Sequence, residues 1–236
     1  MVGGGSDPRP GEISRAHNGV LFLDELPEFS RHVLEVLREP LETGQITISR
    51  AGAQADFPAR FQLVAAMNPC PCGYLGDPQG ECHCSADRVR NYRLRISGPL
   101  LDRIDLQIHV HRPSAEVMQA RQPDGEPSRE VRSRVAACRR AQLERGGVCN
   151  AQLDGDALRA ACCLGEETEA LLSRAMEHHA LSARSYQRML RVALTIADLK
   201  GKPGVDPVAM AEALSLKGLD AVVRPAPPQL GTSSTM

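Results

Sequence analysis

Val20-Leu21-Phe22-Leu23-Asp24-Glu25 is the stretch that decides the fold class of this chain. Four apolar residues that end in two adjacent carboxylates are typical of a short strand buried on both faces, with charge only at its carboxyl-terminal tip. Open α/β sheets bind their ligands at that end of their strands. The stretch therefore predicts an α/β fold with Asp24 and Glu25 at a ligand-binding edge, although a core strand that ends in solvated acids has the same pattern.

The two acids suit nucleotide hydrolysis. In such enzymes one acid holds Mg²⁺ through its water shell, and another carboxylate polarises the attacking water. Asp24 is the candidate for the first role and Glu25 for the second. A second apolar run, Val64-Ala65-Ala66-Met67-Asn68, ends in an amide, and Pro69 cannot continue a central strand. We therefore expect Asn68 at a strand tip beside Asp24.

Two arginines further along the chain suit phosphate binding, because a guanidinium donates paired hydrogen bonds to oxyanions. Arg103 follows a short apolar stretch that begins at Leu100, and Arg184 lies at the start of a strongly periodic helix. Both are candidates for a phosphate clamp.

The chain resembles the AAA+ ATPases of the magnesium-chelatase-like branch, and within that branch the ComM (YifB) group. The resemblance extends to about Asp220 and is carried by four ordered segments: residues 11–19, 68–73, 100–105 and 181–186. It implies these roles: Walker B for Asp24 and Glu25, sensor 1 for Asn68, an arginine finger offered to a neighbouring subunit for Arg103, and sensor 2 for Arg184.

The resemblance also implies a function and partners. It predicts a ring-forming, homo-hexameric motor that uses ATP and Mg²⁺ and acts on DNA as a branch-migration helicase in natural transformation and recombination. A chelatase-type motor that remodels a protein partner is one alternative. A truncated, non-catalytic chain that keeps only partner binding is another.

One part of such a motor is missing from the sequence. A phosphate-binding Gly-x-x-x-x-Gly-Lys-Ser/Thr loop occurs nowhere in the chain, whose only lysines are Lys200, Lys202 and Lys217. The glycines at 3–5 lack both the lysine and a preceding strand. We therefore expect a C-terminal part of a longer protein that does not hydrolyse ATP alone.

The amino-acid composition limits how this chain could bind a partner. The 236 residues carry a net charge of −1, so overall charge does not favour nucleic acid, and aromatic residues make up only 3%. Stacking of bases is therefore unfavourable, and DNA would be held through its backbone charge. No apolar stretch is long enough to span a membrane, and no signal peptide is visible, which predicts a location in the bacterial cytoplasm.

We expect three regions. Residues 1–121 form the later part of an α/β core, with a parallel sheet, flanking helices and a hairpin insert. Residues 122–220 form a small α-helical lid, and residues 221–236 a disordered tail.

Residues 1–14 are rich in Gly and Pro and predict a mobile loop. Residues 45–61 alternate around Ala51-Gly52 and predict a β-hairpin. By the resemblance this is a pore hairpin, with Arg50 near its tip as a candidate nucleic-acid contact, although a solvated arginine is equally compatible.

Further elements follow from caps and periodicity. Ser30 predicts the start of a helix that ends at Gly44, Ser85 the start of an Arg-rich helix, and Asp206-Pro207 the start of a last helix. Residues 104–110 alternate and predict a strand. The apolar stripes of the lid predict core positions: Val131, Val135, Cys138 and Leu143; Leu171, Leu172 and Met176; and Tyr186, Met189, Leu190, Ala193, Ile196 and Ala197.

The chain contains eight cysteines. Because we expect a cytoplasmic protein, we do not expect them to form disulfides. Four fall together, as Cys70-Pro71-Cys72 and Cys82-His83-Cys84. Two close pairs can supply the four soft ligands of a tetrahedral zinc site, with His83 as a possible substitute. Zinc ribbons prefer Cys-x-x-Cys, so the pattern is compatible with structural Zn²⁺ and with reduced loop thiols. Cys138, Cys149, Cys162 and Cys163 are expected to be buried thiols.

Overall fold

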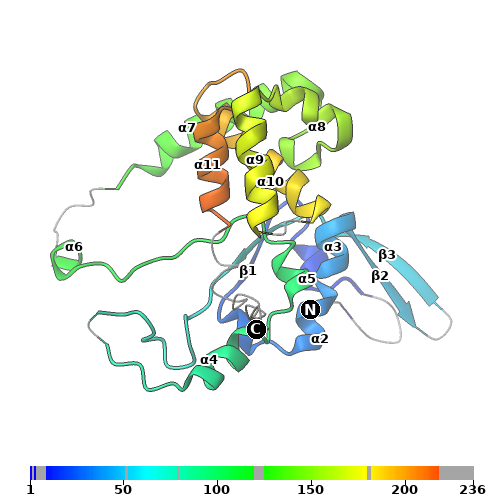
Figure 1. Ribbon diagram of the computed structural model, residues 1–236. Helices are drawn as coiled ribbons and strands as arrows, with labels where there is room; N and C mark the ends of the chain where they lie inside the picture. Colours follow the sequence, from blue (N-terminus) through cyan, green and yellow to red (C-terminus); the bar gives the residue numbers. More distant parts are fainter. Residues whose placement is uncertain are drawn as a thin grey trace, which may run out of the picture. The chain divides into compact units, whose positions relative to one another are not determined.

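The computed structural model describes residues 1, 3, 9–50, 53–78, 80–119, 125–179 and 182–217 (Figure 1). The described chain divides into two compact units, one up to Ile104 and one from Asp105 onward. The first is mixed α/β, and the second is helical. This is the expected class, an α/β unit followed by a helical region. The limits 1–121 and 122–220 stay predictions, since residues 120–124 lie outside the described chain, as does the expected tail 221–236.

The sheet of the first unit is a parallel pair, β1 (Val20–Leu23) and β4 (Gln62–Ala65). Leu23 pairs with Ala65, so both strands end at the same edge. The expectation that β1 is buried on both faces is wrong. Leu21 and Leu23 are buried, whereas Val20 and Phe22 are 58% and 59% exposed. Among the described residues, nothing covers that face of the pair.

Helices cover the buried face of this pair. The expected helix from Ser30 to Gly44 is present but broken into α2 (Arg31–Val36) and α3 (Arg38–Thr43). Pro40 explains the break, because it has no N–H to donate to the carbonyl of Val36. Ser30 caps α2 by accepting a hydrogen bond from the Val33 N–H at 3.4 Å, and Gly44 ends α3 with φ +72°.

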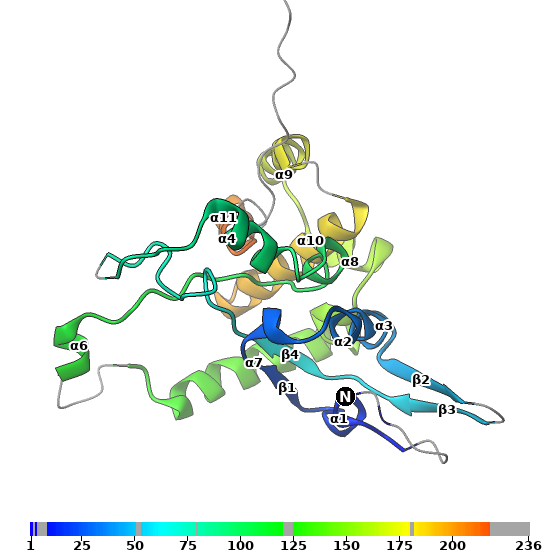
Figure 2. The same cartoon turned by 90° about the horizontal axis from the view of Figure 1, so that it is seen from below.

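The predicted hairpin is confirmed. β2 (Gln45–Arg50) pairs antiparallel with β3 (Ala53–Pro58), and Arg50 faces Ala53 across the ladder (Figure 2). Ile46 and Ile48 are buried near its base. The turn residues 51–52 and the Arg50 side chain lie outside the description.

The remaining elements of the first unit are short. They are α1 (Glu12–Arg15), the 3₁₀ helix η1 (Leu26–Glu28), α4 (Ala86–Arg93) and α5 (Gly98–Leu101). Helix α1 corrects the prediction of a mobile loop at 12–14, since the side chain of Ile13 is fully buried and anchors the turn. Ser85 caps α4 as expected, accepting from the Arg88 N–H at 3.3 Å. The core of this unit is built mainly from Ile13, Leu21, Leu23, Leu26, Leu34, Leu37, Ile46, Ile96, Leu100 and Leu101.

The second unit is a set of helices around α10. It contains α6 (Ala115–Gln119), α7 (Ser128–Gly146), the 3₁₀ helix η2 (Asn150–Gln152), α8 (Gly155–Cys162), α9 (Glu166–His179), α10 (Ala183–Leu199) and α11 (Pro207–Ser215). Helix α10 packs against α7, α8 and α11, and its predicted stripe is buried at Met189, Leu190, Ala193, Ile196 and Ala197. Asp206 caps α11, accepting from the Ala209 N–H at 2.8 Å. No helix in the described ranges is both long and apolar enough to cross a bilayer.

Three expectations for this unit and its border are wrong. Residues 104–110 form no strand, because no described segment offers them a ladder; the Gln107 N–H bonds the Leu216 carbonyl at 2.7 Å instead. Val135 and Leu143 are exposed rather than core, and Gln142 is buried on that helix. Cys163 is exposed and Cys149 half-buried, whereas Cys138 and Cys162 are buried as expected. All eight cysteines are free.

Candidate functional site

The carboxyl ends of β1 and β4 bring three predicted residues to one place. We call Asp24, Glu25 and Asn68 the acid–amide edge. Backbone bonds hold it beyond the strands: the Ala66 N–H donates to the Leu23 carbonyl and the Leu26 N–H to the Ala66 carbonyl, both at 2.9 Å. The side chains of the edge are exposed. Their carboxylate and amide oxygens are therefore open to a ligand.

The turn at Glu25 fixes how the two acids leave the strand. Glu25 has φ +50° and ψ +47°, a left-handed conformation that few non-glycine residues adopt. Its N–H donates to the Asp24 carboxylate at 2.9 Å, which stabilises the turn. The chain then passes directly into η1. Strain of this kind gathers at functional sites, which is consistent with a role for this pair.

Tyr92 of α4 lies behind the edge, and sequence reasoning did not single it out. Tyr92 is buried, and its hydroxyl is close enough to the Asn68 backbone for that backbone to affect its pKa. Burial raises the pKa of Tyr92, and the charges of Glu28 and Glu25 add to the rise. The signal in the sequence was an aromatic residue on the buried face of an otherwise Arg-rich helix.

Two arginines at the end of α4 hold the loops that follow β1 and β4. Arg93 donates through two nitrogens to the Pro69 carbonyl, at 3.1 and 3.0 Å. Arg95 donates to the Pro27 carbonyl at 3.1 Å and to the Glu28 carboxylate at 3.0 Å. We call Tyr92, Arg93 and Arg95 the α4 brace. It ties both strand-tip loops to one helix.

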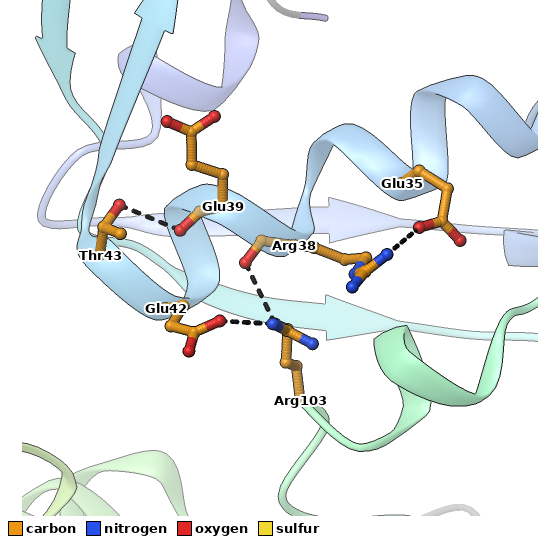
Figure 3. A pocket seen from close by; sticks show the side chains of 6 residues that line it. All are labelled: Glu35, Arg38, Glu39, Glu42, Thr43 and Arg103. Carbon is orange, nitrogen blue, oxygen red and sulfur yellow. Dashed lines mark hydrogen bonds and ion pairs between the residues drawn. The ribbon is translucent and has the colours of Figure 1, made fainter.

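Arg103 lies in a hollow of about 440 Å³ lined by Glu35, Arg38, Glu39, Glu42, Thr43 and Arg103 (Figure 3). Its guanidinium bonds the Arg38 carbonyl at 3.2 Å, the Pro99 carbonyl at 2.7 Å and the carboxylate of Glu42. Only 8% of the Arg103 side chain is exposed. The Arg103 side chain is therefore bonded to groups of its own chain.

Glu35 forms further hydrogen bonds in this hollow. A hydrogen bond from Ser97, followed by one from Arg38 at 2.6 Å, lowers the pKa of the Glu35 carboxyl. Ser97 caps α5, the helix that leads to Arg103. Glu35 pairs with Arg38 and Glu42 pairs with Arg103, whereas the Glu39 carboxylate points away, so the hollow is closer to a structural ion-pair network than to an anion site (Figure 3).

The two remaining candidates lie apart from this edge in the sequence. Arg184 is the second residue of α10, in the second unit, and Ser182 caps that helix by accepting from the Ser185 N–H at 3.2 Å. The backbone of Arg50 ends β2. Their predicted roles, sensor 2 and nucleic-acid contact, stay predictions.

The four clustered cysteines converge. The sulfur of Cys70 lies 3.3 Å from that of Cys72 and 3.7 Å from that of Cys82, and Cys72 and Cys82 are 3.6 Å apart. All four sulfurs, including that of Cys84, lie within 4.8 Å of one another. Within the described residues, His83 is not one of the converging ligands. We call this group the cysteine cluster.

Local backbone geometry builds the cluster. The Gly73 N–H donates to the Cys70 carbonyl at 3.0 Å, closing a tight turn, and Gly73 has φ +84°, which glycine adopts freely. A hydrogen bond with the Tyr74 backbone, and then one with Cys70, lowers the pKa of the Cys72 thiol to about 6. A hydrogen bond with the Cys84 backbone likewise lowers the pKa of Cys82, but burial and the bonds to Cys72 and Cys70 outweigh it and raise that pKa to about 11.

Comparisons with known families agree with this architecture. The family model for magnesium chelatase subunit ChlI matches residues 1–118, and the model for its C-terminal region matches residues 125–217. The chain therefore belongs to the magnesium-chelatase-like family of AAA+ proteins, and within it to the ComM (YifB) type.

Individual relatives support the assignment. The chain is 47% identical over 219 residues to the competence protein ComM of Haemophilus influenzae, which covers 93% of this chain and 43% of that protein. It is 46% identical over 224 residues to the uncharacterised protein YifB of Escherichia coli, covering 94% and 44%. The 38 kDa subunit of magnesium chelatase from Cereibacter sphaeroides is 29% identical over 104 residues, or 44% of this chain and 25% of that protein. The chain thus spans less than half the length of its ComM and YifB relatives.

Proposed function

We propose that this chain is the Walker B, sensor and lid part of a ring-forming ATPase motor, and that the acid–amide edge is its nucleotide-facing site. One observation carries the proposal: parallel pairing of β1 and β4 brings Asp24, Glu25 and Asn68 to one edge with their polar groups exposed. The edge suits Mg²⁺, which prefers oxygen ligands. ATP and Mg²⁺ are accordingly the proposed cofactors of the complete protein.

Each residue has a proposed role. Asp24 would hold Mg²⁺ through its water shell, Glu25 would accept a proton from the attacking water, and Asn68 would orient that water with its amide. Arg103 and Arg184 would contact phosphate oxygens, Arg103 from the neighbouring subunit of a homo-hexamer. Because the sequence contains no Gly-x-x-x-x-Gly-Lys-Ser/Thr loop, these groups need a phosphate cradle from outside it.

We infer DNA as the substrate of the complete motor, with branch migration in natural transformation and recombination as its task and the bacterial cytoplasm as its place. Support comes from a relative named for competence that is 47% identical over 219 residues. The β2–β3 hairpin is the proposed DNA contact through Arg50. The alternative substrate is a protein partner that the motor remodels, and the similarity to a magnesium chelatase subunit supports that alternative.

The test measures ATP turnover by the complete protein with and without single-stranded, duplex and branched DNA. The proposal expects turnover that branched DNA stimulates and that the Glu25→Gln variant lacks. Turnover that responds only to a protein partner would support the chelatase-type alternative, and no turnover under any condition would support a non-catalytic chain. The 236-residue chain alone is expected to show none.

We also propose that the cysteine cluster holds one structural Zn²⁺ ion. Zinc bound by four thiolates at about 2.3 Å in a tetrahedron separates the sulfurs by about 3.8 Å. The separations of 3.3–3.7 Å among the sulfurs of Cys70, Cys72 and Cys82 are close to that value. The site follows Asn68 by only one residue, yet it offers four protein ligands and no open position, so the metal would be structural.

Elemental analysis tests this proposal. Protein purified without added metal should contain about one zinc per chain, and Cys70→Ser combined with Cys84→Ser should lose it. Cys163→Ser is the matched control, because that thiol is exposed and lies outside the cluster. Iron in place of zinc, or reactive thiols at all four positions, would contradict the proposal.

A further inference from the structure

We infer that the α4 brace makes the cysteine cluster a control point for the acid–amide edge: metal bound by the four thiols fixes α4, and α4 positions the loops that carry Glu25 and Asn68. The inference rests on the proposed zinc site. It assigns Tyr92, Arg93 and Arg95 as positioning residues, a role that neither their sequence context nor the family matches indicate.

Chain connectivity supplies the first step. The cluster is adjacent in sequence to the edge on one side and to α4 on the other. Only Pro69 separates Asn68 from Cys70, and only the capping residue Ser85 separates Cys84 from α4. A metal held by both cysteine pairs therefore cross-links the tip of β4 to the beginning of α4. Such a link removes the freedom of the intervening loop.

The contacts at the other end of α4 supply the second step. Arg93 returns to the Pro69 carbonyl, beside Asn68, while Arg95 reaches the Pro27 carbonyl and Glu28, just beyond Glu25. Tyr92, a buried residue of the same helix, lies close to the Asn68 backbone. Residues at the end of α4 therefore contact the loops that follow both halves of the edge, and the helix itself begins just after the cluster.

The same contacts explain why the metal would matter. The loop between the cysteine pairs is long, and its turns, such as Asp77 N–H to the Tyr74 carbonyl at 3.1 Å, are local. The contacts among the thiols tie the segment just before α4 to the residues just after β4. Release of the cluster would let α4 shift, and the brace would then hold the strand tips less firmly.

Hydrogen exchange on the 236-residue chain tests the inference without needing ATP. The informative amides are those of Leu26 and Ala66, which bond across the strand tips, read in peptides that span residues 20–29 and 62–69. Zinc removal should speed their exchange by about tenfold, the change expected when one hydrogen bond's contribution is lost. Amides of the β2–β3 hairpin serve as an internal reference.

Variants separate the brace from the metal. Arg93→Ala combined with Arg95→Ala should speed exchange at Leu26 and Ala66 by a similar factor while zinc stays bound, and zinc removal should then add little. Arg93→Lys should restore part of the protection, since an ammonium can donate one bond to the Pro69 carbonyl. Arg90→Ala is the matched control: Arg90 is on the same helix but forms an exposed pair with Asp87 at 3.0 Å.

The outcomes are distinct. Bound zinc, faster edge exchange on its removal and a brace variant that reproduces the effect would support the inference. Bound zinc with unchanged edge exchange on removal would overturn the inference and leave the zinc site standing. Unchanged exchange in the brace variant would overturn the role of Arg93 and Arg95. Equal acceleration of the hairpin amides would show global unfolding and overturn a local coupling, and absence of metal would overturn the zinc proposal along with it.

Discussion

The guanidinium of Arg103 forms an ion pair with the carboxylate of Glu42 inside the same chain. Two further bonds, to the backbone carbonyls of Arg38 and Pro99, complete its surroundings. An arginine finger must point toward a neighbouring subunit. The proposed role of Arg103 therefore requires that assembly compete with a set of bonds already made.

Loss of Arg103 should accordingly lower the stability of the chain itself. Arg103→Ala removes a side chain that is only 8% exposed, together with its bonds to the Arg38 and Pro99 carbonyls and to Glu42, and should reduce the free energy of unfolding by about 2–3 kcal/mol, measured by urea denaturation. Arg15→Ala, which removes an exposed pair with Glu12 at 3.1 Å, should change it by less than about 0.5 kcal/mol. Equal effects of the two variants would count against a structural role.

A mixing experiment in the complete protein tests the role in a neighbouring subunit. Arg103→Ala protein and Glu25→Gln protein should each be inactive, yet mixed rings should recover part of the ATP turnover, because some interfaces then hold an intact Arg103 opposite an intact Glu25. Glu25→Gln alone should still bind Mg-ATP, since the amide keeps the shape of the carboxylate but cannot take a proton. No recovery at any mixing ratio would argue for a role within one subunit.

Glu35 gives a prediction for pH. Its bonds to Ser97 and Arg38 lower its pKa from the ordinary 4.5 in the folded chain. A lowered folded pKa means that the contribution to stability is complete above the unfolded value and is lost as pH falls through the folded pKa. The stability difference between the wild type and Glu35→Gln should therefore be largest near neutral pH and shrink below about pH 4.5. A difference that stays constant down to acid pH would contradict it.

Asn150 should be the most sensitive polar residue of the second unit. It is 1% exposed; its backbone N–H bonds the Gln142 side chain at 3.1 Å, and its amide donates to Thr195 at 3.1 Å and to Asp198 at 2.7 Å. Asn150→Ala leaves the buried Asp198 carboxylate short of a donor and should cost about 2–4 kcal/mol in thermal or urea unfolding. Gln152→Ala, in the same 3₁₀ helix but exposed, is the control and should have little effect.

Local signals were enough for most of the secondary structure. Ser30, Ser85 and Asp206 cap the helices that they predicted, because a side-chain oxygen next to the first turn needs no partner from elsewhere in the chain. The hairpin followed from alternation around a short turn for the same reason. Pro40 could have predicted the break between α2 and α3, since the missing N–H is a property of the residue itself.

Contacts distant in sequence were beyond such signals. Residues 104–110 have the alternation of a strand and form none, because pairing depends on a partner that periodicity does not reveal. Tyr92, Arg93 and Arg95 carry no motif, and their contacts with Asn68, Pro69, Pro27 and Glu28 appear only once α4 packs behind the strand tips. Burial of Gln142 in place of Leu143 was likewise decided by its bond to Asn150.

The sequence by itself determined the α/β class, the acids after β1, the amide after β4 and the spacing of the four cysteines, since each is a pattern of neighbouring residues. Only the tertiary structure decided that β1 and β4 run parallel and in register, that the cysteine pairs meet, and that Arg103 is held by Glu42. The reason is physical: local patterns fix backbone preferences, whereas the choice among long-range partners depends on which packing buries the apolar faces while leaving no buried polar group without a bond.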